Sequence, residues 1–164
     1  MRTYESFLSL IAELDGDALE IERVRAHNQK AWQRIQEGAT DVIDWGALGF
    51  TIHTLYGVAE NYFLRISKFF ENNLPQERWH KALVEKMALD ISGVRPPLFT
   101  TQTEKQEALE LLKFRHRVRN LYGEDLDPKK TENIQDIAYN FFSAFPQMHQ
   151  VFRSKILAIA EALR

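Results

Sequence analysis

Apolar residues recur at intervals of three and four along most of this chain, and this spacing constrains the fold more than any other feature. Between Tyr4 and Gln36 an apolar side chain returns to one helical face at nearly every turn, and four later stretches repeat the pattern. No stretch of strict alternation between apolar and polar residues rivals these periods. The pattern predicts an all-α protein, an up-and-down helical bundle of four to six helices.

Residues that typically begin or end helices divide the chain into five predicted helices. Thr40 or Asp41 can cap the second helix, Thr101 with Glu104 forms a capping box, and Asp127 precedes a proline that suits a first helical turn. Breaks are possible within the first helix at Asp15-Gly16 and within the last at Pro146. The predicted helices are Tyr4–Gln36, Asp41–Asn72, Glu77–Asp90, Thr101–Tyr122 and Asp127–Leu163.

Two segments differ from the simple amphipathic pattern. The second predicted helix has apolar residues on nearly every face, so we expect it at the centre of the bundle. Ser92–Thr100 contains Gly93 and the pair Pro96-Pro97, which disfavour helical backbone, so we expect one long irregular loop there.

Length and composition are those of an ordinary globular protein. The 164 residues are 45% apolar and 27% charged, which predicts a single domain over residues 1–164. The sequence has no cysteine, so disulfides and thiolate metal sites are excluded. A net charge of −2 points to no nucleic-acid or membrane partner for the molecule as a whole, so such a partner would need a local patch.

The sequence favours a cytoplasmic protein without a membrane partner. The amino end lacks a basic region followed by an apolar run and a small-residue cleavage site. The most apolar window, Trp45–Leu64, contains His53 and Glu60, which suits a buried core helix rather than a membrane span. We expect His53 to be a core histidine whose polar atoms are hydrogen-bonded.

The densest group of basic and polar side chains lies in the segment Lys113–Gly123. At about 100° per residue, the apolar side chains of this helix share one side and the polar ones spread over an arc of roughly 160° opposite them. Guanidinium groups bind anionic oxygens in pairs, and imidazole moves protons near neutral pH, so the arc suits a phosphate. Basic residues here could equally stabilise the helix by opposing its dipole. The polar arc comprises Arg115, His116, Arg119, Asn120 and Tyr122.

Three motifs occur in order along the chain. They are Trp79-His80-x-x-Leu83-x-x-x-Met87, then Gly93-Val94-Arg95-Pro96-Pro97, then Phe114-Arg115-His116-x-x-Arg119-Asn120-x-Tyr122, with Leu126-Asp127 just after. Together they resemble the HepT-like branch of the HEPN superfamily. The resemblance implies a helical bundle that commonly forms a homodimer, with the arginine motif of both protomers in a shared cleft. It also implies a metal-independent ribonuclease toxin that cleaves RNA such as tRNA, needs no cofactor and is paired with a minimal nucleotidyltransferase antitoxin.

The motif of that family is an arginine, four to six residues, and then a histidine. Arg115 matches the arginine, but Asn120 stands where the histidine belongs, and an amide cannot act as a general acid or base. We therefore hypothesise that His116 partly replaces the missing imidazole, while Asn120 orients the phosphate or the 2′-hydroxyl. Both Arg115 and His116 are then expected to face an open groove.

The resemblance carries over to further positions with lesser weight. In the family a tyrosine two positions after the histidine can be adenylylated by the antitoxin, and Tyr122 matches it, although it could equally seal the end of a helix. Arg119 and Arg95 are candidate RNA-binding cations, and Arg95 could instead hydrogen-bond carbonyl groups beneath its loop.

Two readings other than a nuclease stay open. One is a catalytically weak or inactive HEPN module that binds RNA or nucleotide, and the other is a helical adaptor that dimerises and holds a nucleotidyltransferase. A metal site is not expected, because Glu77-x-x-His80 is a single copy of a spacing that di-iron bundles use twice. His80, beside Trp79, is expected to pack or hydrogen-bond locally.

Overall fold

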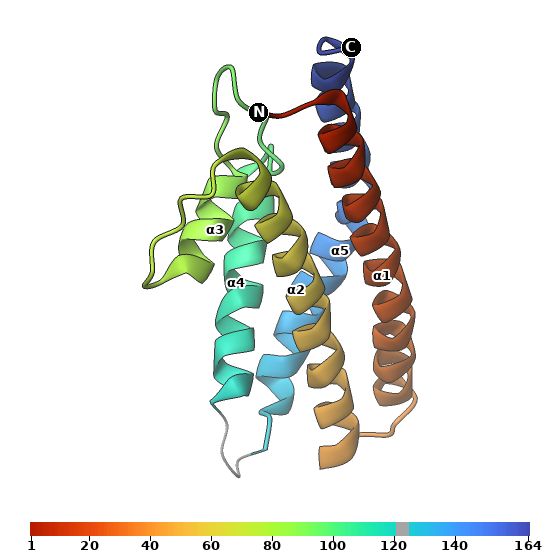
Figure 1. Cartoon of the computed structure of the whole chain (residues 1–164). Helices are drawn as coiled ribbons and strands as arrows, with labels where there is room; N and C mark the ends of the chain where they lie inside the picture. Colours follow the sequence, from red (N-terminus) through yellow and green to blue (C-terminus); the bar gives the residue numbers. More distant parts are fainter. Residues whose placement is uncertain (121–124) are drawn as a thin grey trace.

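The computed structural model describes residues 1–120 and 125–164, and all of its regular structure in that part of the chain is helical apart from one isolated bridge between Ile91 and Arg95. This confirms the prediction of an all-α helical bundle. Figure 1 shows the four longer helices side by side, with the short α3 packed outside α2 and α4. The helices are α1 (Tyr4–Gln36), α2 (Val42–Phe70), α3 (Trp79–Met87), α4 (Gln102–Arg119) and α5 (Pro128–Glu161).

The helices begin where short-range capping places them. The side chain of Asp41 accepts hydrogen bonds from the first turn of α2, and the side chain of Asp44 accepts one from the backbone N–H of Asp41. Thr101 and Glu104 form the same reciprocal arrangement at α4, and Asp127 caps α5 ahead of its first-turn proline. These three predicted starts are confirmed because each depends on residues within a single turn.

Both possible breaks prove to be tolerated. α1 runs through Gly16, since buried residues on both sides of it hold the helix against the bundle and an exposed helical glycine costs only about 1 kcal/mol. α5 continues through Pro146, whose neighbours Phe145 and Met148 are buried in the core. α3 starts two residues later than predicted, because Arg78 has a left-handed backbone (φ 55°) that no α-helix can contain.

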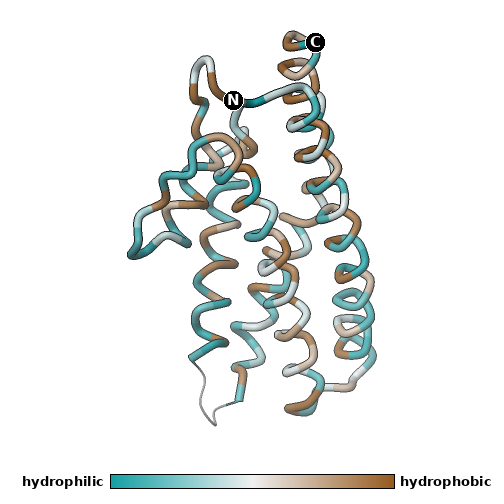
Figure 2. The backbone as a smooth tube through the Cα atoms, in the orientation of Figure 1, coloured by the Kyte–Doolittle hydropathy of each residue, from teal (hydrophilic) through white to brown (hydrophobic). Residues whose placement is uncertain are grey.

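α2 lies in the middle of the bundle, as expected from its apolar surface. It contacts each of the other four helices, and its buried side chains lie on nearly all of its faces. The other helices bury only one face, and in Figure 2 apolar and polar segments accordingly alternate along them. Among the described residues, no helix combines the length and the hydropathy needed to cross a membrane.

Candidate functional site

Helices α2, α3 and α4 meet around one buried carboxylate, Glu60. Its side chain is only 6% exposed, and its two oxygens face different partners. Oε2 accepts a hydrogen bond from Nδ1 of His80 on α3 at 2.8 Å, and Oε1 lies 3.9 Å from Nη1 of Arg115 on α4. Burial of a carboxylate is costly unless it is paired, so Glu60 fixes the relative positions of these two side chains.

Arg115 is held close to α2 but is incompletely paired. Its side chain is 20% exposed and lies over Gly57, where an added Cβ would be 2.8 Å from Nη1. The contact with Glu60 at 3.9 Å is too long for a hydrogen bond, and Nε is buried without a partner among the described residues. We predicted that Arg115 lies on an exposed arc. It is instead partly buried against α2, and some of its N–H groups have no hydrogen-bond partner among the described residues.

Two imidazole rings meet at this site. His80 stacks on Trp79 with ring centroids 3.6 Å apart, and its ring meets that of His116 edge-to-face at 5.3 Å. Because Nδ1 of His80 donates to Glu60, its Nε2 is the nitrogen left for proton exchange. His116 is exposed, as predicted, and lies one residue after Arg115.

The surroundings lower the pKa of His116. Partial burial is the largest cause, followed by the nearby charge of His80 and those of Arg119 and Arg115, while Glu60 opposes the shift. This shift favours the neutral imidazole, which is the form that can accept a proton.

The positive field of the site also reaches α2. The pKa of His53 is lowered first by burial and then by the charges of Arg115 and Arg119. His53 is thus a half-buried neighbour of the site. Burial and the charge of Glu60 raise the pKa of Tyr56, whose buried hydroxyl lacks a hydrogen-bond partner within the described ranges.

Arg119 and Asn120 lie at the carboxyl end of α4, and both are exposed. The side-chain amide nitrogen of Asn120 (Nδ2) donates a hydrogen bond to the backbone carbonyl oxygen of His116 at 2.9 Å. This bond closes the last turn of α4 and favours a role in positioning His116 over direct contact with a phosphate.

Arg95 lies apart from the proposed catalytic cluster, by which we mean Glu60, His80, Arg115, His116 and Arg119. Its side chain is 0% exposed and its guanidinium donates to Glu71, at 3.0 Å from Nε and 2.5 Å from Nη2. The remaining donors are taken by the carbonyl oxygens of Lys86, Leu89 and Pro96. Arg95 therefore hydrogen-bonds carbonyl groups within the fold, which was the alternative to RNA binding. We correct its assignment as an RNA-binding residue. Tyr122, the candidate for adenylylation, lies outside the described residues.

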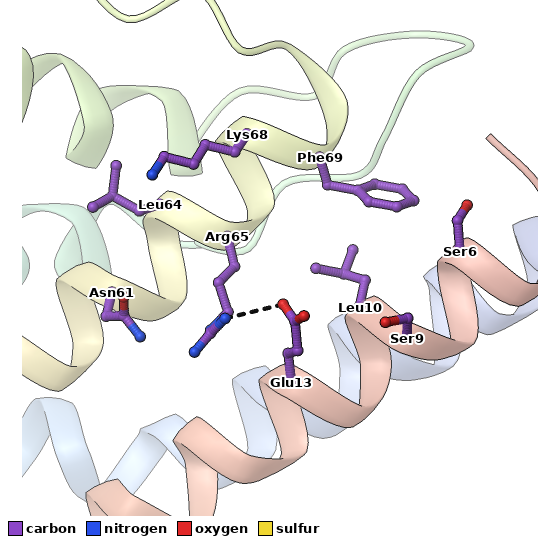
Figure 3. Close-up of a pocket in the computed structure, with 9 residues that line it drawn as sticks. All are labelled: Ser6, Ser9, Leu10, Glu13, Asn61, Leu64, Arg65, Lys68 and Phe69. Atoms are coloured by element: carbon purple, nitrogen blue, oxygen red, sulfur yellow. Dashed lines mark hydrogen bonds and ion pairs between the residues drawn. The ribbon is translucent and has the colours of Figure 1, made fainter. Parts of the chain in front are cut away.

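Polar groups in the other half of the bundle satisfy one another. In the hollow of about 490 Å³ between α1 and α2, Arg65 points to Glu13 and bonds it at 3.0 Å, as Figure 3 shows, and it also bonds Asp17 at 2.7 Å. Between α2 and α5, the Tyr62 hydroxyl bonds His149, which in turn bonds Asp15 at 2.8 Å. In both groups an arginine forms a short ion pair with a carboxylate of α1, Arg65 with Asp17 at 2.7 Å and Arg153 with Asp15 at 3.0 Å.

Sequence reasoning missed two members of the site, Glu60 and His80. Glu60 carried a usable signal, because a carboxylate in the most apolar helix needs a buried partner. His80 lay in a quoted motif, but its hydrogen bond to a residue 20 positions earlier cannot be read from helical spacing. The described residues gather no group of three or more histidine, aspartate or glutamate side chains that could hold a metal ion.

A family model described as "HepT-like protein" matches residues 47–156, which include all of α3 and α4 and most of α2 and α5. The matched range also contains Glu60, His80, Arg115 and His116. Neither the curated proteins nor the solved structures give a match to this sequence.

Proposed function

This chain belongs to the HepT-like protein family, and from that premise we propose that it is an endoribonuclease toxin of the HEPN type that cleaves RNA without a metal ion. The observation that carries the proposal is the position of Arg115. Its guanidinium is 20% exposed and keeps unused donors, and it shares Glu60 with His80, whose ring contacts that of His116. One phosphodiester could therefore meet positive charge and two proton carriers together.

The proposed reaction needs only groups of this cluster. His116 accepts the proton of the 2′-hydroxyl while the 2′-oxygen forms its bond to phosphorus. His80 donates a proton to the 5′-oxygen as the bond between that oxygen and phosphorus breaks. Arg115 and Arg119 stabilise the negative charge that develops on the phosphoryl oxygens. The products are a 2′,3′-cyclic phosphate and a 5′-hydroxyl.

Two further residues act through the histidines. Glu60 orients His80 by accepting from Nδ1, which leaves Nε2 directed away from that bond. Asn120 holds the carbonyl of His116 and with it the end of α4. From the sequence alone, His116 is the residue expected to replace the missing motif histidine, whose part the amide of Asn120 cannot perform. In this assignment His116 and His80 share that part.

The partners follow from the family. We propose RNA, with tRNA among the candidate substrates, a minimal nucleotidyltransferase as antitoxin, a homodimer as the assembled form and a cytoplasmic location. Adenylylation of Tyr122 remains part of this proposal, since it would add a bulky anion two residues after Asn120. Mass spectrometry after incubation with ATP and the partner enzyme tests it, and an unmodified Tyr122 would count against it.

Cleavage of total RNA and of tRNA by purified protein tests the function. We expect Arg115→Ala to reduce cleavage by roughly 10²–10³-fold, as loss of a group that stabilises transition-state charge does. We expect His80→Ala and His116→Ala to reduce it by roughly 10²–10⁴-fold as proton carriers. Arg117→Ala is the matched control, because Arg117 is exposed on the same helix but outside the cluster. Equal rates for wild type and Arg115→Ala would remove the cluster from the mechanism.

A second candidate function is an inactive module that binds RNA or nucleotide. The observation in its favour is that Asn120 uses its amide to cap α4 and so replaces a catalytic histidine with a structural group. Binding of RNA that is weakened by Arg115→Ala, with no cleavage by the wild type, would select this function.

A further inference from the structure

A groove of about 550 Å³ lies between α3 and α4 beside the proposed catalytic cluster. It shares His80 and His116 with that cluster, so a ligand in the groove would lie beside the imidazoles. We propose that this groove binds the nucleobase of the nucleotide next to the scissile phosphate, an inference that rests on the proposed function. Its lining residues are Arg78, His80, Lys81, Gln106, Leu109, Leu112, Lys113 and His116.

The groove combines an apolar floor with a cationic rim. Leu109 and Leu112 supply the apolar surface, and Arg78, Lys81 and Lys113 line the edges. A nucleotide offers the matching pair of a flat, weakly polar base and an anionic phosphate. The volume falls within the range of about 300–1,000 Å³ typical of sites for small ligands.

Charge complementarity favours an anionic occupant. Of the groove's lining residues none is a carboxylate, although the whole chain has a net charge of −2. Lys113 pairs with Glu110 at 3.1 Å and Lys81 approaches Glu85 at 4.0 Å, but both pairs are exposed and exchange readily with a phosphate. The basic character is therefore local to the groove.

The backbone of Arg78 gives an independent indication. This residue precedes α3 with φ 55° and ψ 29°, a conformation in which glycine is unstrained and arginine is not. Its side chain makes no capping hydrogen bond, and within the described residues no carboxylate pairs with it. Its placement on the groove wall leaves the planar guanidinium free to stack on a base or to bind a phosphate.

The test uses RNA that cannot be cleaved, so that binding is separated from catalysis. Fluorescein-labelled 2′-O-methyl octanucleotides of U, C, A or G are compared with an abasic phosphodiester of equal length and charge. For the wild-type protein we expect at least one base to bind roughly tenfold tighter than the abasic chain. Equal binding of all five probes overturns the proposal.

Variants locate the effect in the groove. Arg78→Gly removes the cation while relieving the backbone strain, and Leu109→Glu places a negative charge on the floor. We expect both to bring the ratio of base to abasic affinity close to one. Asn72→Gly is the matched control, because Asn72 has φ 50° outside the groove, and it should bind as the wild type does. Since Leu109→Glu could disturb folding, an unchanged ratio in Arg78→Gly is sufficient to overturn the proposal.

The outcomes separate this inference from the proposed function. Cleavage that depends on Arg115 together with base-independent binding would keep the nuclease and remove the base site. Base-dependent binding lost in Arg78→Gly, without any cleavage by the wild type, would keep the site and remove the nuclease. Light scattering tests whether a second copy of the chain occupies the groove instead. If Leu109→Glu converts a dimer to a monomer, the groove is a dimer interface and the proposal is overturned.

Discussion

Arg95 and Arg115 both lie near a buried glutamate, yet their surroundings differ in the property that decides function. Every nitrogen of the Arg95 guanidinium donates to Glu71 or to a backbone carbonyl, and the side chain is sealed from solvent. Arg115 keeps a partnerless Nε among the described residues and a loose 3.9 Å approach to Glu60. A sealed cation whose donors are all used belongs to the fold, whereas Arg115 is 20% exposed and has spare donors, so it is available to a ligand.

The largest effect should come from the sealed arginine. Arg95→Ala leaves Glu71 and three carbonyl groups without their partner, so we expect a loss of about 3–5 kcal/mol in the free energy of unfolding. Arg115→Ala should cost about 1 kcal/mol or less, because it breaks no short hydrogen bond. Urea unfolding of both variants measures the difference. Similar losses of unfolding free energy in Arg95→Ala and Arg115→Ala would contradict the claim that only Arg95 is a structural residue.

The pair between Glu60 and His80 should matter to cleavage more than to stability. Glu60→Gln keeps the shape but removes the charge and lets the amide present a donor to Nδ1, so His80 can lose its orientation. We expect cleavage to fall by roughly 10–100-fold, as it does when the orienting partner of a metal-bound histidine is removed. A positioning role also predicts a displaced pH profile of cleavage. An unchanged rate and profile in Glu60→Gln would contradict it.

Gly57 allows the close approach of Arg115 to α2. In Gly57→Ala the new methyl group would lie 2.8 Å from Nη1, so the guanidinium must move outward. We expect cleavage to fall several-fold while the melting temperature changes little, since alanine also favours the helix by about 1 kcal/mol. Gly46→Ala, at a helical glycine with open space around it, is the control. Equal cleavage by both variants would show that the position of Arg115 is not critical.

The smallest effect concerns the stability of the site against acid. The folded-state pKa of His116 lies below its ordinary value of 6.5, so the unfolded chain binds the proton more readily. Stability should therefore fall as the pH drops below about 6.5, and it should be unaffected by this group at higher pH. The unfolding free energy of wild type minus that of His116→Gln, measured from pH 5 to pH 8, isolates the contribution. A difference that grows toward acid pH would have the wrong sign.

The sequence predicts the features of this protein that depend on neighbouring residues. The cap at Thr101 is confirmed, and of the two candidates Thr40 and Asp41 the structure has Asp41, because each cap forms within one turn. The sealed Arg95 was not distinguished from a ligand-binding cation, because a Gly-Val-Arg-Pro-Pro loop does not say which way its arginine points. The link from Glu60 to His80 depends on how α3 docks on α2, which no helical period specifies.

The chemical nature of the RNA ends tests the central claim most directly. If Arg115, His80 and His116 act on the 2′-hydroxyl as proposed, every new 3′ end is a 2′,3′-cyclic phosphate, every new 5′ end is a hydroxyl, and EDTA leaves the rate unchanged. Mass spectrometry of the fragments from a defined tRNA reads these ends. New 3′-hydroxyl and 5′-phosphate ends, or cleavage that persists undiminished in Arg115→Ala, would contradict the account.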